Sequence, residues 1–210
     1  MTQASNSDPQ LRTASESLVN LLKTKIGAHL KSIQIELDHV VARIDRAQLL
    51  DVCRILKLDS ELHFDFFVNI TAVDWMDGAE ERFEVVYHLM NSEKFYRLRV
   101  KAWLPEEDPK IESVSSLWNG ANFMERETWD MYGIVFSNHP DLRRILMYDE
   151  FKGHPLRKDY PVQGKQPRIP LRYPEVSNTA RDMIRPELIQ IGRKVKPQAE
   201  LRVFRDADTT

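Results

Sequence analysis

The sequence predicts an α+β fold: a two-layer domain with helices packed on a mixed β-sheet, followed by an extended C-terminal arm. Stretches with helical apolar spacing and stretches of strand-like alternation follow one another in residues 1–150. Residues 151–210 instead hold 7 of the 11 prolines and 13 Lys+Arg against 7 Asp+Glu. We therefore expect a flexible N-terminus over 1–14 and the α+β domain over 15–150. Residues 151–210 are expected to be either a solvated disordered tail or an extended arm that orders on a partner and wraps it.

The first half of the domain is predicted as helix, strand and helix. Leucine and isoleucine recur at helical spacing and predict a helix over residues 15–31. Strict alternation of apolar and polar residues predicts a half-buried strand over 33–37. Asp45 is a suitable N-cap for a second helix, which the apolar spacing extends to residue 58.

The second half is predicted as three strands and a helix. Residues 64–73 are rich in aromatic and β-branched residues, and residues 83–89 and 95–104 alternate as strands do. Asp108 followed by Pro109 is typical of an N-cap with proline at the first helical position. We therefore expect a helix that runs from there to residue 117 or beyond.

Composition excludes several classes of function. The 210 residues carry 30 Lys+Arg against 32 Asp+Glu, which is not the basic excess of a dedicated nucleic-acid binder. No apolar run is long enough to cross a bilayer, and the first twenty residues lack the apolar core of a secretory signal. Cys53 is the one cysteine, so an internal disulfide and a thiolate-held iron–sulfur cluster are excluded. Its helical context predicts a buried core thiol.

Charged residues gather in one stretch between residues 125 and 160. On a helix, Arg126 and Asp130 would lie one turn apart and could pair. His139 and His154 each precede a proline and are therefore expected in loops. The candidate site residues are Glu125, Arg126, Glu127, Asp130, Gly133, His139, Pro140, Leu142, Arg143, Arg144, His154, Pro155, Arg157, Lys158, Asp159 and Tyr160.

No known catalytic or metal motif accounts for this stretch. A metal site built from its acidic and histidine residues would have a spacing that matches no compact motif. Neither a dinucleotide or phosphate-binding glycine loop nor a GxSxG nucleophile elbow is present. The plain interpretation is a set of ion pairs and hydrogen bonds that tie loops to a partner, a role for which arginine is well suited.

The same stretch carries a family resemblance. The strings ERETWDMYGIVFSNHPDLRRILMYDEF and GHPLRKDYP resemble the signature of the 30 kDa, or C-type, subunit of the respiratory NADH:quinone oxidoreductase, complex I. The resemblance includes the upstream Thr71-Ala72-Val73-Asp74 and spans roughly residues 30 to 165. Three departures are small: Phe123 stands where the family often has Trp, Trp129 where it often has Tyr, and Asn138 where glycine is common. Asparagine tolerates positive φ, so Asn138 can replace the glycine.

The resemblance implies a structural subunit of the peripheral arm of the complex. It implies no catalytic residue, no cofactor and no metal in this chain, because FMN and the iron–sulfur clusters belong to partner subunits. Those subunits pass electrons from NADH to quinone, coupled to proton translocation. The main partner would be the D-type subunit, which forms the quinone site with the cluster-bearing B-type subunit. The implied location is peripheral, at the cytoplasmic face of the bacterial inner membrane, without nucleic acid.

A structural role for the stretch follows as a hypothesis. Its cations would be held by Glu125, Glu127, Asp130 and partner carboxylates, and Gly133 would permit a turn. The apolar side of the segment would be packed by Leu142, Ile145 and Leu146. Two alternatives stay open: an equivalent scaffold subunit of a membrane-bound hydrogenase or of an F420H2- or ferredoxin-linked oxidoreductase, and an RNA-binding adaptor that uses the positive arm.

Overall fold

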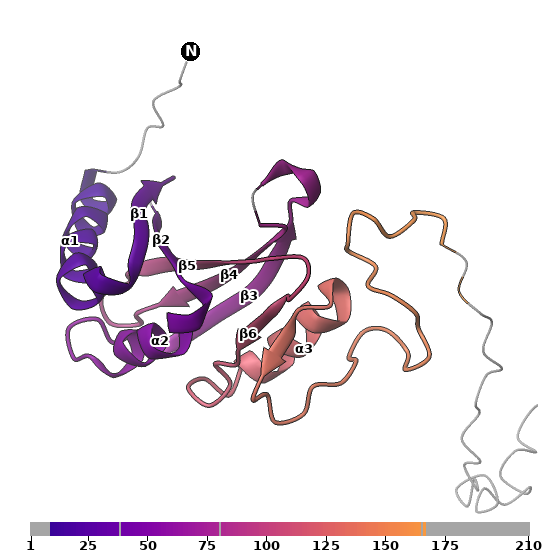
Figure 1. Ribbon diagram of the computed structural model, residues 1–210. Coiled ribbons are helices and arrows are strands. Elements are labelled where there is room, and N and C mark those ends of the chain that lie inside the picture. Colours follow the sequence, from indigo (N-terminus) through magenta and orange to yellow (C-terminus); the bar gives the residue numbers. More distant parts are fainter. Residues whose placement is uncertain (1–8, 38, 80, 165, 167–210) are drawn as a thin grey trace, which may run out of the picture. The chain divides into compact units, whose positions relative to one another are not determined.

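The computed structural model describes residues 9–37, 39–79, 81–164 and 166, and it has the predicted α+β fold (Figure 1). Its helices are α1 (Pro9–Ile26), α2 (Leu49–Leu58) and α3 (Ala121–Tyr132). Its strands are β1 (Leu30–Glu36), β2 (His39–Ile44), β3 (Phe66–Asp74), β4 (Phe83–Met90), β5 (Arg97–Leu104), β6 (Lys110–Glu112) and β7 (Val135–Ser137). No helix in the described part of the chain is both long enough and apolar enough to span a membrane.

The main sheet is mixed, as predicted. Its five strands lie in the order β1-β2-β5-β4-β3, and only the β2–β5 pair is parallel. The parallel pairing follows from the connection, because the chain leaves β2 through α2 and the β3–β4 hairpin before it returns as β5. A second, small parallel sheet joins β6 to β7 and leads the chain into and out of α3.

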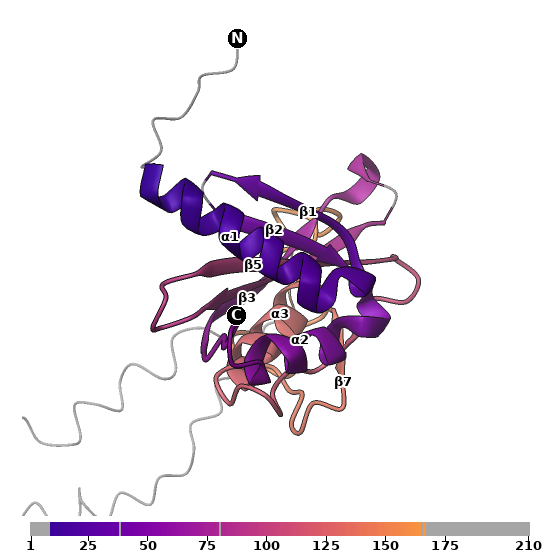
Figure 2. The same cartoon turned by 90° about the vertical axis from the view of Figure 1, so that its left-hand side faces the viewer.

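One hydrophobic core joins the helices to a single face of the sheet. Helices α1 and α2 lie along this face (Figure 2), and α3 packs against β3. The core contains Leu18 and Leu22 of α1, Leu56 of α2, and Tyr87 and Val100 of the sheet, all 1% exposed or less. The Cys53 thiol lies within it, and burial raises its pKa to about 12, so it is an inert core thiol.

Three element predictions are corrected. The first helix begins at Pro9 and ends at Ile26, before the expected residues. A strand that the sequence analysis missed, β2, lies between β1 and β5. Its residues are buried on both faces, so it lacks the alternation that predicts strands. Asp45 does act as a cap, but it accepts a hydrogen bond from the Ala47 amide at a short 3-10 turn that precedes α2.

The expected helix after Asp108-Pro109 is wrong. These residues precede strand β6, and the carbonyl of Pro109 accepts a hydrogen bond from the amide of Val135. The preference of this dipeptide for a helix start is local, whereas β6 is stabilised by a partner strand 25 residues further along the chain. The helix that the sequence analysis expected here is formed later, by α3.

The predicted terminal segments lie mostly outside the described residues. Residues 1–8 of the expected N-terminus and residues 167–210 of the expected arm belong to this group. Residues 151–164, which the sequence analysis assigned to the arm, make specific contacts with the domain instead. These contacts form a large part of the site described next.

Candidate functional site

The C-terminus of α3 is closed by the GHPLRKDYP segment. A helix end leaves its last four carbonyl groups without helical partners. The carbonyl of Trp129 accepts from the amide of Gly133, and that of Met131 accepts from the amide of Leu156. The remaining two accept from side chains: Nδ1 of His154 lies 3.0 Å from Asp130 O, and Nε of Arg157 lies 2.5 Å from Tyr132 O. Every orphan carbonyl of α3 therefore has a donor.

Gly133 makes this closure possible. It follows α3 in the left-handed conformation, with φ +76°. A Cβ atom there would lie 2.6 Å from atoms of His154 and Arg157. The glycine is therefore required twice, for the backbone turn and for the close approach of the two capping side chains. The turn expected at Gly133 is confirmed.

Asp130 organises the HPDLRRIL segment. Its side chain is fully buried, and Oδ1 lies 2.5 Å from Nη1 of Arg144. Its other oxygen, Oδ2, accepts hydrogen bonds from the successive amides of Ile145, Leu146 and Met147 at 2.8–3.1 Å. Burial raises the pKa of the Asp130 carboxyl, but these amides and Arg144 together outweigh burial and lower it. One carboxylate thus fixes the turn that follows Arg144.

Arg144 and Arg126 also donate hydrogen bonds to backbone carbonyls. Arg144 donates from Nη2 to the carbonyls of Phe151 and Gly153, at 2.8 and 3.2 Å. Arg126 donates to the carbonyls of Arg143 and Arg144, at 3.2 and 3.3 Å. The predicted one-turn pair between Arg126 and Asp130 is therefore not formed, because Asp130 is occupied by Arg144.

A second buried carboxylate, Asp74 at the end of β3, holds the GHPLRKDYP segment at Lys158. It forms a bidentate pair with Arg82, with both N–O distances 3.0 Å, and it accepts from the amide of Lys158 at 2.8 Å. Arg82 also pairs with Glu106 and, at 3.1 Å, with Asp159. Burial raises the pKa of Asp74, but Arg82 and the amides of Lys158 and Met76 outweigh it and lower the pKa to about 2.

Glu125 lies in a different environment, inside the core. Its oxygens accept from the Ser113 hydroxyl at 2.6 Å and from the Val114 amide at 2.8 Å, and its side chain is fully buried. Nε2 of His139 lies 3.8 Å away and donates to the carbonyl of Asn122. Burial raises the pKa of Glu125 to about 7, although the two hydrogen bonds oppose this shift. The sequence analysis expected Glu125 to hold a cation of the stretch. The structure shows that it does not.

The remaining predicted residues have smaller roles. Arg143 is exposed and pairs with Asp141, and Glu127 is exposed on the outer side of α3. Leu142 packs against the core, and Ile145 and Leu146 are exposed on this chain. Pro140 and Pro155 lie outside helices and strands, as do the histidines before them. The ring of Tyr160 stacks on Phe151.

Sequence reasoning missed the second half of the cluster. Arg82 and Glu106 carry no motif, and Asp74 was noted only as part of the family resemblance. The available signal was an aspartate at the end of a strand that was expected to be buried. A buried aspartate needs a partner in any fold. The identity of that partner depends on the β3–β4 hairpin, which pairs Asp74 with Phe83 and so brings Arg82, the preceding residue, close to Asp74.

The side chains of the site serve to hold residues 141–160 in place. Among residues 9–37, 39–79, 81–164 and 166, no three His, Cys, Asp or Glu side chains are placed to hold a metal ion. Two buried carboxylates, Asp74 and Asp130, bind the two ends of residues 141–160. We call these residues the fastened segment. This geometry holds a surface segment in a defined conformation.

Comparisons of sequence identify the family of the chain. Residues 42–166 match the family described as the respiratory-chain NADH dehydrogenase 30 kDa subunit. The C-type subunit of the NADH-quinone oxidoreductase of Geobacter sulfurreducens is 46% identical over 143 residues, which cover 68% of this chain and 87% of that protein. The protein of the same name from Polynucleobacter necessarius is 37% identical over 194 residues and covers 88% and 94% of the two chains.

Solved structures show the same fold. A trypsin-resistant fragment of Nqo5 superposes with a TM-score of 0.52 at 30% identity, over 61% of this chain and 99% of the fragment. A chain of the membrane-bound sulfane sulfur reductase, an archaeal respiratory membrane complex, gives a TM-score of 0.62 at 25% identity, over 70% and 86%. The chain belongs to the family of the 30 kDa subunit of respiratory-chain NADH dehydrogenase, the C-type subunit of a multisubunit NADH-quinone oxidoreductase.

Proposed function

We propose that this chain is a structural subunit of the peripheral arm of a proton-translocating NADH:quinone oxidoreductase. It binds no cofactor and carries no catalytic residue. FMN and iron–sulfur clusters in partner subunits carry the electrons. Its main partner is the D-type subunit, close to the quinone site that this partner forms with the B-type subunit. As part of this complex, the chain lies at the cytoplasmic face of the membrane and does not enter the bilayer.

The observation that supports this proposal most is how the charges of the family signature are used. The carboxylates of Asp130 and Asp74 are bound by an arginine and by backbone amides of the same chain. A catalytic acid or base must instead reach the group from which it moves a proton. Charged groups that are paired within the chain stabilise its conformation. A scaffold subunit needs a stable conformation because it presents a surface to its partners.

The fastened segment presents apolar side chains outward. Leucine, isoleucine, tyrosine and valine side chains are exposed along it and just after it, at Ile145, Leu146, Tyr148, Leu156 and Val162. The two carboxylate anchors fix the backbone from which these side chains project. Rigid apolar side chains on a monomer surface are typical of a protein interface. We assign this surface, the apolar ridge, to the contact with the D-type subunit.

The experiment replaces the ridge in cells that express the full complex. The double variant Leu146→Asp/Leu156→Asp should lower the yield of assembled complex about tenfold or more, because it places charges in an apolar contact. The control is Leu58→Asp, since Leu58 is also an exposed leucine, at 75%, but lies at the end of α2. Activity per assembled complex should be unchanged in both. Full assembly with lost activity would overturn the scaffold proposal.

The absence of a cofactor is tested on the purified chain. We expect it to be colourless and inactive toward NADH and quinone. Iron or flavin near one equivalent per chain would contradict the proposal.

A second candidate is an equivalent scaffold subunit of a different respiratory membrane complex. The likeness to a chain of the sulfane sulfur reductase complex favours it, because the same fold serves there. Subunits that co-purify with the native chain distinguish the two: a flavin subunit of the NADH type supports our proposal, and a hydrogenase or sulfur-reductase subunit supports the alternative.

A further inference from the structure

The face of the main sheet opposite to the helices carries a row of cations. Successive side chains of a strand point to opposite faces, so the neighbours of the core residues Val100 and Ala102 point away from the helices. We call this surface the basic face and define it by Arg97, Arg99 and Lys101 of β5 together with Arg43 of β2.

The register places two cations opposite one another and a histidine opposite a third cation. Arg43 pairs with Lys101 across the β2–β5 ladder, and His88 pairs with Arg99 across the β4–β5 ladder. Like charges directly opposite on one sheet face destabilise it. The pKa of His88 lies below its ordinary value of 6.5, first because of burial and then because of Arg99 and His39. The chain therefore bears an electrostatic cost at this face.

Among the residues that the structure describes, carboxylates neutralise this face only in part. Glu84 is buried and pairs with Lys101 at 3.2 Å, and it also accepts a hydrogen bond from Trp75. Within the part of the chain that the structure describes, no carboxylate lies within 4.0 Å of the guanidinium groups of Arg97 and Arg99. Nε of Arg43 is buried without a hydrogen-bond partner. Positive charge is therefore left over in a domain whose residues 1–150 are acidic overall.

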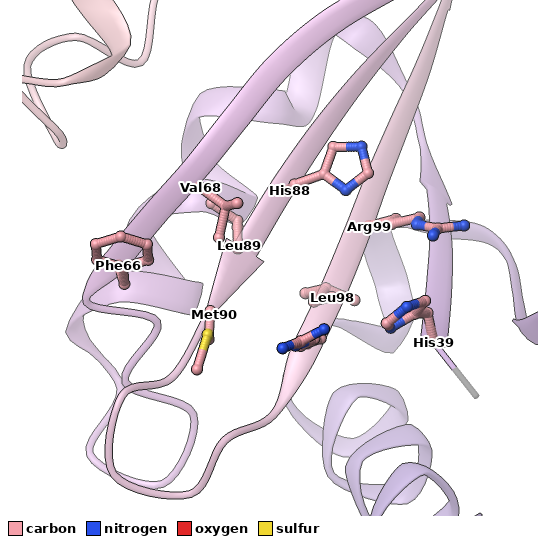
Figure 3. A pocket seen from close by; sticks show the side chains of 9 residues that line it. His39, Phe66, Val68, His88, Leu89, Met90, Leu98 and Arg99 are labelled. Carbon is pink, nitrogen blue, oxygen red and sulfur yellow. The ribbon is translucent and has the colours of Figure 1, made fainter. Parts of the chain in front are cut away.

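The face is hollowed and partly apolar at the end near Arg97. A cavity of about 270 Å³ is lined by Phe66 and Val68 of β3, Met90 of β4, and Arg97 and Arg99. Figure 3 shows His88 and Arg99 projecting from neighbouring strands, with Phe66 and Val68 on β3 beside them. Arginine, phenylalanine and methionine are the residues in which protein interfaces are enriched.

We propose that the basic face docks an acidic segment of another protein subunit, with an apolar side chain of that segment in the hollow beside Phe66. This inference rests on the proposed function only in taking the partner from the same complex. Charge complementarity excludes the nearest alternatives: residues 167–210 carry 9 Lys+Arg against 6 Asp+Glu, and a second copy in a two-fold contact would oppose the same cations.

The test is a charge reversal in the full complex. The variant Arg97→Glu/Arg99→Glu should lower the fraction of the chain bound in the complex by about tenfold or more, and added salt should weaken the wild-type contact. The matched control is Lys23→Glu/Arg54→Glu, which makes the same charge change at exposed positions of α1 and α2. Thermal unfolding of each purified chain shows whether the variants fold.

A second measurement identifies the occupant. The Arg99→Lys variant keeps the charge and adds an amine that a carbodiimide joins only to a carboxylate in direct contact. A cross-link from position 99 to an Asp or Glu of another subunit supports the proposal. Cross-links only within the chain or to a second copy, or release of the contact by nuclease, would overturn it. Normal incorporation of the folded double variant would also overturn it, while leaving the scaffold function intact.

Discussion

Asp130 and Arg144 form an ion pair of 2.5 Å although 14 residues separate them, and the carboxylate is fully buried. Arg144 is positioned by what surrounds it, since its guanidinium also lies over the rings of Trp129 and Phe151. The neighbouring Arg143 has the same side chain in a different environment, with 70% of it exposed beside Asp141. Two adjacent arginines therefore provide a matched pair for experiment.

Replacing Arg144 with Ala should lower the free energy of unfolding by about 3–5 kcal/mol, because it leaves the Asp130 carboxylate buried without its cation. Replacing Arg143 with Ala should cost less than about 1 kcal/mol, as for an exposed pair. Urea denaturation of the purified chains measures both values, and native gels measure assembled complex. Equal effects of the two substitutions would refute the assignment of Arg144 as the structural arginine.

Gly133 provides a second matched pair with Gly120. Gly133→Ala places a Cβ 2.6 Å from His154 and Arg157 at φ +76°, so we expect a loss of more than about 1–2 kcal/mol, the conformational cost alone. Gly120→Ala introduces a Cβ with nothing within 4 Å at a φ of −64°. That substitution should be neutral or stabilise by up to about 1 kcal/mol. Thermal unfolding distinguishes the two, and a tolerated Gly133→Ala would contradict the described closure of α3.

Glu125 should make stability depend on pH. Its pKa of about 7 exceeds the ordinary value of 4.5, so the folded chain holds the proton more tightly than the unfolded chain. Its contribution is fully present below pH 4.5 and is lost as the pH rises through about 7, an effect on the order of 3 kcal/mol.

The Glu125→Gln variant should therefore lose less stability than the wild type between about pH 5 and about pH 8. Glu127→Gln, on the exposed side of the same helix, is the control and should follow the wild type. Denaturant unfolding across this range measures the difference. Parallel curves for all three chains would show that Glu125 is not held in its protonated form by burial.

The hydrogen bond between Asp74 and Lys158 should protect the fastened segment from proteolysis. Its carboxylate accepts from the amide of Lys158, so Asp74→Ala should speed tryptic cleavage after Arg157 and Lys158 by more than about tenfold. Asp149→Ala, at an exposed position, should leave the cleavage rate unchanged. Cleavage that is equally slow in both variants would show that the segment is held by other contacts.

The same contact has a pH dependence of opposite sign. The pKa of Asp74 is lowered to about 2 from an ordinary value of 3.8. Its contribution to stability is present above pH 3.8 and is lost as the pH falls toward about 2. The amide of Lys158, followed by hydrogen exchange, should lose its protection in that acidic range before the amides of β4 do. Loss of protection in the reverse order would place the acid-sensitive contact elsewhere.

The sequence by itself determined the fold class, the family and the residues of the signature. Composition identified β3, and the spacing of apolar residues identified β4, β5 and α2; both signals are local in the sequence. A long shared string identified the family, and the turn at Gly133 was visible in it. None of these conclusions required knowledge of which segments meet in space.

The tertiary structure alone decided how the charges are used. Arg126 was expected to pair with Asp130 one turn away, but Asp130 binds Arg144, because the buried carboxylate can also satisfy three backbone amides of the returning chain. The strand β2 and the basic face likewise depend on pairing between segments more than 50 residues apart. Local spacing specifies which side chains share a face, whereas the partner of a buried charge is set by the folded path of the whole chain.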